Sequence, residues 1–349
     1  MQRILLLMGV LISCMNALAE PVDDMVNNLM TANQIPGLVL QVVHHGQTVK
    51  TAAYGQANLE WNIPATPETV FEIGSITKQF TAACILILVQ DGKLSLDDPI
   101  SRHLTNTPAS WSDITIRHLL THTSGITNYT GLDGFELSRH LTQPQFITQI
   151  GVQPKLFATG TQYSYCNTGY NLLGFIIENV SGQPYWDFLT ARILQPLGMT
   201  ATVKREPGNI LARRAAGYDF VAGHPVNRDV NYTDLFSAGE IASTVGDLMK
   251  WNAGLDSAKL LGDSAKSQWW TAGKLNDGTP IGYGFGWFLN PLAGHRCQAH
   301  GGATSGFSAA NLRFPDDGLE LVVLSNCGKE GVANTVAQAV AKSYLAGKN

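Results

Sequence analysis

The sequence predicts an α+β protein in which one antiparallel sheet, formed by both ends of the chain, is covered by helices and carries a mostly helical insert. Apolar alternation bounded by turn residues indicates five strands, at residues 37–44, 47–54, 297–302, 307–314 and 319–325. The long stretch between the two groups of strands has mainly helical signals and loops. We therefore expect one catalytic unit, with a core of residues 20–98 and 281–349 around an insert of residues 99–280.

A hairpin and then a helix follow one another in the N-terminal part of this core. The strand at 37–44 ends at a His-Gly turn that leads into the second strand. Residues 75–90 contain neither glycine nor proline and are apolar on nearly every face beyond the first turn. This pattern predicts a helix that is buried all round, and the Asp-Gly pair that follows provides its C-terminal cap.

The insert and the C-terminal part complete the predicted fold. Helices are predicted in the insert at 116–122, 169–180 and 185–194. The last two strands meet at a Pro-Asp-Asp-Gly turn, and a final helix is predicted at 331–345.

The composition fits a globular enzyme and excludes some partners. The chain has 349 residues, of which 44% are hydrophobic and 14% charged, and its formal net charge is −4. This charge gives no electrostatic reason to expect nucleic acid as a partner.

The first nineteen residues have the pattern of an export signal. A short basic start precedes an apolar run, and Ala17-Leu18-Ala19 offers small residues where a signal peptidase cuts. We expect a signal peptide at 1–19 and a periplasmic or secreted protein. An alternative is a lipoprotein anchored at Cys14, because Leu-Ile-Ser-Cys resembles a lipobox. No later segment is long enough to be a transmembrane span.

Export would place four cysteines in an oxidising compartment: Cys84, Cys166, Cys297 and Cys327. Four cysteines allow three complete disulfide pairings, and the sequence cannot choose among them. Cys84 lies in the apolar helix and Cys327 ends an apolar strand, so we interpret both as small buried residues. No Cys-x-x-Cys spacing indicates a zinc or redox site.

A nucleophile is indicated at the start of the buried helix. Ser75 lies at the predicted helix N-terminus, and Lys78 follows on the same face at i+3. A serine hydroxyl needs a base to take its proton, and a desolvated lysine can be that base. The helix N-terminus also favours a developing oxyanion. The motif is short, and the competing interpretation is a capped helix with a solvated lysine.

Two histidines four residues apart are candidate metal ligands. His118 and His122 have zinc-ligand spacing, but no glutamate follows His118, so the H-E-x-x-H motif is absent. The missing glutamate argues against a zinc site, and we predict no metal and no cofactor.

Several motifs together resemble one protein superfamily. Residues 71–80, which include Ser75 and Lys78, resemble the first motif of the serine β-lactamases and penicillin-binding proteins. Further segments typical of one branch follow in the expected order: 116–125, Tyr165-Cys166-Asn167, 237–239, 283–287 and His300-Gly301-Gly302. This branch contains class C β-lactamases, D,D-peptidases, D-aminopeptidases and β-lactamase-like carboxylesterases. The resemblance implies a β-lactamase-like fold with its site between sheet and insert.

The resemblance also implies roles for individual residues. Tyr165 would share the general-base role with Lys78 and protonate the leaving group, with Lys78 as the cationic neighbour that lowers its pKa. Asn167 would orient Lys78 and bind the substrate. Cys166 stands where the branch more often has serine or alanine, and its side chain is still small.

The strand motif departs from the family pattern. His300-Gly301-Gly302 stands in place of Lys-Thr-Gly, and the N–H of Ala303 would join that of Ser75 in an oxyanion hole. A histidine with an ordinary pKa is largely neutral at pH 7, so it holds a substrate carboxylate less well than lysine does. Arg296 could compensate, because two-residue alternation places it on the same strand face as His300.

Three hypotheses for the function follow. The first is a serine hydrolase that forms an acyl-enzyme on small ester, amide or peptide substrates, as a carboxylesterase or broad peptidase/esterase. The second is a D-alanyl-D-alanine carboxypeptidase or class C-type β-lactamase, for which β-lactams would be acylating ligands. The third is a non-catalytic penicillin-binding-like sensor, which would not need Ser75, Lys78 and Tyr165 together.

Overall fold

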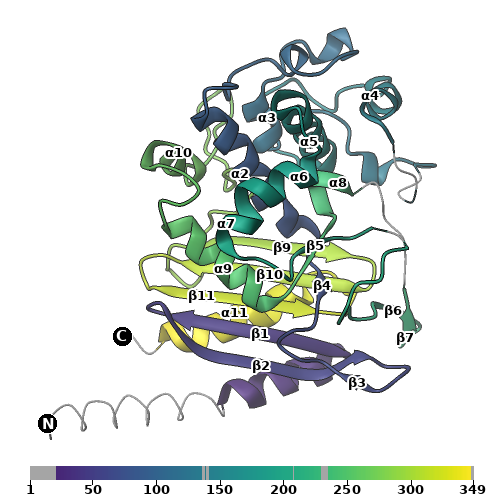
Figure 1. Cartoon of the computed structure of the whole chain (residues 1–349), viewed down its shortest axis with the longest axis vertical. Coiled ribbons are helices and arrows are strands. Elements are labelled where there is room, and N and C mark those ends of the chain that lie inside the picture. Colours follow the sequence, from purple (N-terminus) through teal and green to yellow (C-terminus); the bar gives the residue numbers. More distant parts are fainter. Residues whose placement is uncertain (1–20, 136–137, 139–140, 207, 229–234, 347–349) are drawn as a thin grey trace, which may run out of the picture.

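The computed structural model describes residues 21–135, 138, 141–206, 208–228 and 235–346. The expected signal peptide and the lipidation alternative at Cys14 lie outside these residues. The chain folds into a helix-covered antiparallel sheet below a helical region (Figure 1), so the predicted α+β class is confirmed.

The central sheet joins the two ends of the chain. Its strand order is β3-β2-β1-β11-β10-β9, and every neighbouring pair is antiparallel. In chain order, the bounds are β1 Gly37–His44, β2 Gln47–Asn58, β3 Ile63–Pro64, β9 Gln298–Thr304, β10 Phe307–Phe314 and β11 Leu319–Ser325. The pairing of Leu40 with Val323 places the first strand beside the last. The sequence pattern predicted five of these strands, and β3 is too short to show alternation.

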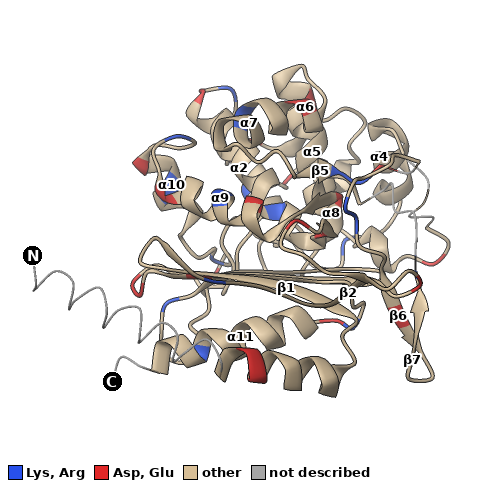
Figure 2. Cartoon of the chain, turned by 60° about the horizontal axis from the view of Figure 1, so that its bottom comes forward, with Lys and Arg blue, Asp and Glu red and all other residues tan. Residues whose placement is uncertain are grey.

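Two helices cover one face of the sheet. The helix at residues 21–33 and α11 (Val332–Leu345) lie together beneath the strands (Figure 2). Val22, Val26 and Met30 pack with apolar side chains of β1, β11 and α11 in one buried cluster. Burial of that apolar surface is the main force that fixes this layer.

The other face carries the helices that lead to the site. α9 (Val245–Asp256) packs on β1 and β11, although it belongs to the range expected as insert. α2 (Thr77–Gln90) lies in the helical region above the sheet (Figure 1), and its residues from Thr77 to Leu88 are all buried. The prediction of an all-round buried helix is therefore correct.

The helical region and two small sheets complete the molecule. Its helices are α3 Ile116–Leu120, α4 Gln143–Gly151, α5 Asn167–Ser181, α6 Tyr185–Leu189, α7 Gln195–Leu197, α8 Phe236–Gly239 and α10 Asp263–Trp269. A π-helical turn, η5 (Thr190–Leu194), joins α6 to α7. One small sheet contains β4 Phe71–Glu72, β8 Ile241–Ser243 and β5 Val203–Lys204, and β6 Tyr218–Val221 pairs with β7 His224–Asn227.

The cysteines and the hydropathy of the helices add two observations. Cys84, Cys166, Cys297 and Cys327 are all buried and free. No helix in the described part of the chain combines the length and the apolar character needed to cross a bilayer.

Candidate active site

Ser75 lies between β4, a strand of the small three-stranded sheet, and α2. It occupies the 3-10 turn η1 (Gly74–Ile76), directly before α2 begins. Gly74 has a φ of +49°, and a Cβ there would lie 2.8 Å from the backbone N of Ala303. A side chain at this position would clash with backbone, so the glycine lets the nucleophile segment approach β9.

Lys78 lies in the first turn of α2 and is completely buried. Its Nζ lies 3.1 Å from Ser75 Oγ and donates to the carbonyl of Ala238 at 2.8 Å. Among the described residues, no carboxylate forms an ion pair with it. Burial lowers the pKa of Lys78 well below 10.5, so loss of its proton is favoured. A neutral amine beside a serine hydroxyl can act as a base.

Tyr165 completes the cluster from the segment before α5. Lys78 Nζ lies 4.9 Å from the centre of its ring. The phenol oxygen is buried, and no described residue forms a hydrogen bond of good geometry with it. Burial raises the pKa of Tyr165, and the nearby Ser75 hydroxyl offsets this only in part. The phenol therefore stays protonated, and Lys78 is not among the groups that lower its pKa, contrary to expectation.

Asn167 is held by a neighbouring loop. Its Nδ2 donates to Thr130 Oγ1 at 3.1 Å, and its backbone N–H donates to Asn128 Oδ1 at 3.0 Å. Lys78 is held instead by Ala238 on α8. The sequence marked residues 237–239 as typical of the branch but did not identify that carbonyl as the partner of Lys78.

β9 lies against η1 through glycine. A Cβ on Gly302 would lie 1.9 Å from the carbonyl oxygen of Ile73 and 3.2 Å from the backbone N of Ser75. A Cβ on Gly301 would instead meet Asn334 of α11 at 2.4 Å, on the other face of the sheet. Only glycine at 302 lets the strand approach so closely that the backbones of Ser75 and Ala303 meet at one seam.

His300 is a neutral, fully bonded residue of β9. Its Nδ1–H donates to the carbonyl of Gly301 at 2.5 Å, and its Nε2 accepts from the Tyr283 hydroxyl at 2.9 Å. Burial, with a smaller contribution from Lys78, lowers the pKa of His300 to about 3. His300 therefore brings no positive charge to the site at pH 7. Tyr283 belongs to the segment 283–287, which the sequence marked without naming this contact.

Arg296 does not compensate for this missing charge. It precedes β9, and its guanidinium binds both oxygens of Asp316, at 2.9 and 2.6 Å. Both side chains are exposed. The expectation that Arg296 shares a strand face with His300 is wrong, because the strand begins only at Gln298.

His118 and His122, which have zinc-ligand spacing in the sequence, make different contacts in the structure. His118 Nδ1 accepts from the backbone N–H of Thr115 at 3.1 Å and so caps the start of α3. His122 lies beyond the end of α3 and packs against Tyr165. In the described part of the chain, no group of three or more potential ligands could hold a metal ion.

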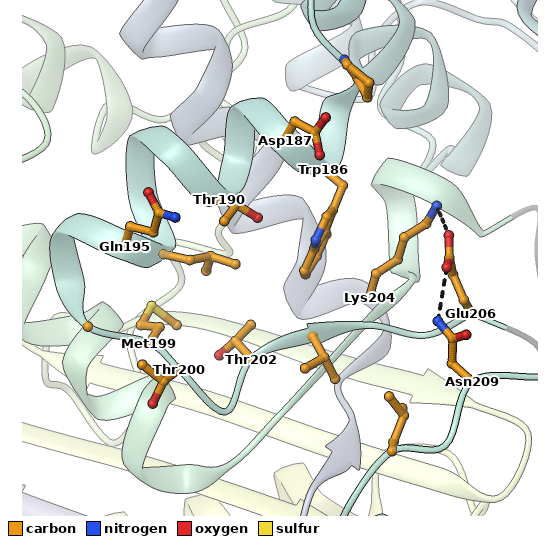
Figure 3. A pocket seen from close by; sticks show the side chains of 15 residues that line it. Trp186, Asp187, Thr190, Gln195, Met199, Thr200, Thr202, Lys204, Glu206 and Asn209 are labelled. Carbon is orange, nitrogen blue, oxygen red and sulfur yellow. Dashed lines mark hydrogen bonds and ion pairs between the residues drawn. The ribbon is translucent and has the colours of Figure 1, made fainter.

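A cavity of about 700 Å³ lies away from this cluster, between α6, α7 and β5 (Figure 3). Trp186 and Met199 project into it, and Lys204 at its rim binds Glu206 at 2.7 Å. None of the residues predicted for the site lines this cavity. The chemistry of Ser75 and Lys78 therefore belongs to the seam between η1, α8 and β9.

Comparisons with known proteins identify the family of the chain. The Beta-lactamase family model matches residues 22–345. Protein flp of Staphylococcus aureus (strain N315) is 31% identical over 330 residues, which cover 91% of this chain and 65% of that protein. The chain thus spans just under two thirds of the length of this relative.

Two solved structures are also similar. The octameric penicillin-binding protein homologue from Pyrococcus abyssi has a TM-score of 0.79 and 27% identity, over 95% of this chain and 78% of that one. The D-amino acid amidase from Ochrobactrum anthropi SV3, in complex with L-phenylalanine amide, has a TM-score of 0.81 and 25% identity, over 95% and 100%. With its fold, its seam at Ser75 and the match over residues 22–345, the chain belongs to the Beta-lactamase family, within the serine β-lactamase and penicillin-binding protein superfamily.

Proposed function

We propose that the protein is a serine hydrolase that forms an acyl-enzyme at Ser75 on small esters or amides without a free carboxylate near the scissile bond. One observation carries the proposal: the buried Lys78 amine, which has no carboxylate partner among the described residues, lies 3.1 Å from Ser75 Oγ. A lysine buried without such a partner costs stability, and this cost is understandable where the amine serves as a base.

The proposed reaction has two steps. Ser75 Oγ attacks the carbonyl carbon while Lys78 Nζ takes the hydroxyl proton, and the backbone N–H groups of Ser75 and Ala303 bind the oxyanion. The protonated phenol of Tyr165 then gives a proton to the leaving oxygen or nitrogen and recovers one from Lys78. Water releases the acyl group and restores the serine. Asn167 would bind the substrate from the loop side.

The neutral state of His300 supports the choice of substrate. A carboxylate at this place would face a buried, uncharged ring rather than a lysine, and Arg296 is bound to Asp316. An amide or ester without a carboxylate needs no positive charge at this place. The structural similarity to an amidase solved with L-phenylalanine amide favours the same class. A carboxylesterase or broad peptidase/esterase thus remains ahead of a D-alanyl-D-alanine carboxypeptidase, a class C-type β-lactamase or a silent sensor.

Export is a separate part of the proposal. Residues 1–19 would be removed as a signal peptide, which would release the protein into the periplasm or medium. The competing proposal is a lipid anchor on Cys14. Mass spectrometry of the mature N-terminus separates the two, because cleavage after Ala19 leaves Glu20 first.

The central test is Ser75→Ala. We expect this change to abolish both hydrolysis of p-nitrophenyl butyrate and covalent labelling by a fluorescent phosphonate. Ser325→Ala is the matched control, since it removes a buried hydroxyl that donates to the Gly37 carbonyl, outside the site. Persistent hydrolysis by the Ser75 variant would refute the mechanism.

A matched pair of substrates tests the choice of class. An acyl-D-Ala-D-Ala peptide and its C-terminal carboxamide differ only in the charge of that end. We expect kcat/KM for the carboxamide and for the short ester to exceed that of the free acid. A clear preference for the acid, or rapid turnover of nitrocefin, would move the function to a carboxypeptidase or β-lactamase.

A further inference from the structure

His122 is a buried residue in an unusual backbone position beside the site. It follows the last residues of α3, has a φ of +59°, and is 1% exposed. A left-handed conformation is rare for histidine and costs stability. Side chains of the site surround its ring, with centroid distances of 4.4 Å to Tyr165, 5.0 Å to Tyr170 and 4.7 Å to Tyr283.

His122 binds the chain on both sides of Tyr165. The backbone N–H of Ser164 donates to the His122 carbonyl at 3.0 Å. The backbone N–H of Cys166 donates to His122 Nδ1, also at 3.0 Å. Tyr165 therefore lies between two peptide groups that are both fixed to one residue, and its ring packs on that residue.

This contact requires one state of the imidazole ring. Because Nδ1 accepts a hydrogen bond, the ring must be neutral with its proton on Nε2. Burial lowers the pKa of His122 well below 6.5, and Lys78 and His300 lower it further, so the accepting state persists at neutral pH. Nε2 is buried and has no hydrogen-bond partner among the described residues. His122 thus has a strained backbone and a buried Nε2–H without a hydrogen-bond partner among the described residues. Neither feature serves to cap α3, because His118 does that.

We propose that His122 is a positioning residue that sets the place of the Tyr165 phenol through the Ser164 and Cys166 peptide groups. This inference rests on the proposed proton transfer through Tyr165. It assigns a role in the site to a histidine that touches neither the substrate nor Ser75. The expected consequence is that loss of the Nδ1 acceptor slows acylation more than it weakens binding.

The test compares three substitutions of the same residue. His122→Leu removes the acceptor. His122→Asn restores one, because Oδ1 is attached to Cγ as Nδ1 is, and asparagine tolerates the left-handed backbone. His122→Gly relieves the backbone without an acceptor. We expect the leucine and glycine variants to show phosphonate labelling of Ser75 and kcat reduced about 10- to 100-fold with little change in KM, and the asparagine variant to recover most of the rate.

Two controls separate positioning from a merely structural role. His118→Leu removes the histidine that caps α3, the helix before His122, so the Tm of this variant should fall while its labelling rate stays unchanged. In a Tyr165→Phe background, the effect of His122→Leu on the rate should disappear, since both changes act on the same proton transfer.

The outcomes are distinguishable. Wild-type labelling rates in folded leucine and glycine variants, an asparagine variant no better than leucine, or full additivity with Tyr165→Phe would each overturn the inference. If the leucine variant does not fold, the glycine and asparagine variants decide. If the wild-type protein itself is not labelled at Ser75, the proposed function fails first, and the inference fails with it.

Discussion

Two buried basic side chains in this molecule, Lys78 and Arg313, have opposite surroundings. Arg313 on β10 is 3% exposed, and its guanidinium binds Glu320, Gln298 and Asp256, at 3.3, 2.9 and 2.5 Å. Lys78 is equally buried, yet among the described residues its Nζ has only the Ser75 hydroxyl and the Ala238 carbonyl as hydrogen-bond partners. Two carboxylates and an amide oxygen accept hydrogen bonds from Arg313, whereas no carboxylate among the described residues binds Lys78.

The difference follows from what each group can do when it leaves water. A guanidinium keeps its proton at any ordinary pH, so a buried arginine must find anions. An amine can lose its proton, which removes the cost of burial and leaves a lone pair. Burial with partners therefore indicates a structural cation, and burial without them indicates a base. The following changes test that distinction.

The largest effect is expected from Lys78→Met. Loss of the base should lower kcat/KM for the ester about 10³-fold. The free energy of unfolding of this variant should instead be at least that of wild type at pH 7. Because burial lowers the folded-state pKa of Lys78 from 10.5, protonation of the unfolded chain disfavours folding at every pH below about 10.5.

Stability measurements over a range of pH complete this prediction. We expect the Tm of Lys78→Met to be at least that of wild type at pH 7, with the advantage shrinking as the pH approaches 10. A variant that is both inactive and strongly destabilised at pH 7 would mean that Lys78 is a charged structural residue like Arg313.

Arg313→Met should show the opposite pattern. It leaves Glu320 in a site where burial already raises the pKa of its carboxyl. We expect a loss of about 3–5 kcal/mol in the free energy of unfolding, because one partner of a buried pair is removed. The kcat/KM of the folded variant should stay within about twofold of wild type.

A second substitution serves as the control. Adding Glu320→Gln to Arg313→Met removes the unpaired acid and should recover part of the stability in urea unfolding. If Arg313→Met instead retained wild-type stability, the acceptors around it would not be the reason for its burial.

The smallest effect is expected at Glu240, a buried acid two residues after Ala238. Burial raises its pKa to about 7, and Lys204 opposes this shift. A pKa raised above 4.5 in the folded state means that stability is complete below pH 4.5 and is lost as the pH rises through 7. Glu240→Gln mimics the protonated acid.

We therefore expect Glu240→Gln to match wild type at pH 4.5 and to gain roughly 1–3 kcal/mol at pH 8, as measured by chemical unfolding. Asp316→Asn is the control, since it removes an exposed acid already bound to Arg296 and should give no gain. A gain that does not depend on pH would show that Glu240 has the same pKa in the folded and unfolded states, so that its ionisation would not be the cause of the gain.

The sequence predicted the helices and strands in which residues of one kind recur at a regular spacing. Alternation located the long strands of the central sheet, and the spacing of Ser75 and Lys78 placed both on one helix face. The helix at 21–33 was missed although Val22, Val26 and Met30 have helical spacing. The small sheet was missed because strands of two or three residues are too short for any periodicity.

Contacts between distant segments of the chain could not be predicted. The Ala238 carbonyl that holds Lys78 is 160 residues away, and no local pattern marks a backbone oxygen. The neutral state of His300 and the raised pKa of Tyr165 depend on burial, which the sequence suggests only through the family resemblance. The engagement of Arg296 with Asp316 depends on where β9 begins.

The glycines at the seam restrict how the protein can acquire new substrates. A Cβ at Gly302 would overlap the Ile73 carbonyl, and one at Gly286 would lie 2.7 Å from the carbonyl oxygen of Lys78. These positions tolerate no side chain, so directed evolution cannot enlarge or reshape the site through them. Tyr163 is 37% exposed and packs on His122 and Tyr283, so it has room to vary. Libraries for altered selectivity should therefore vary such rim positions and leave the seam unchanged.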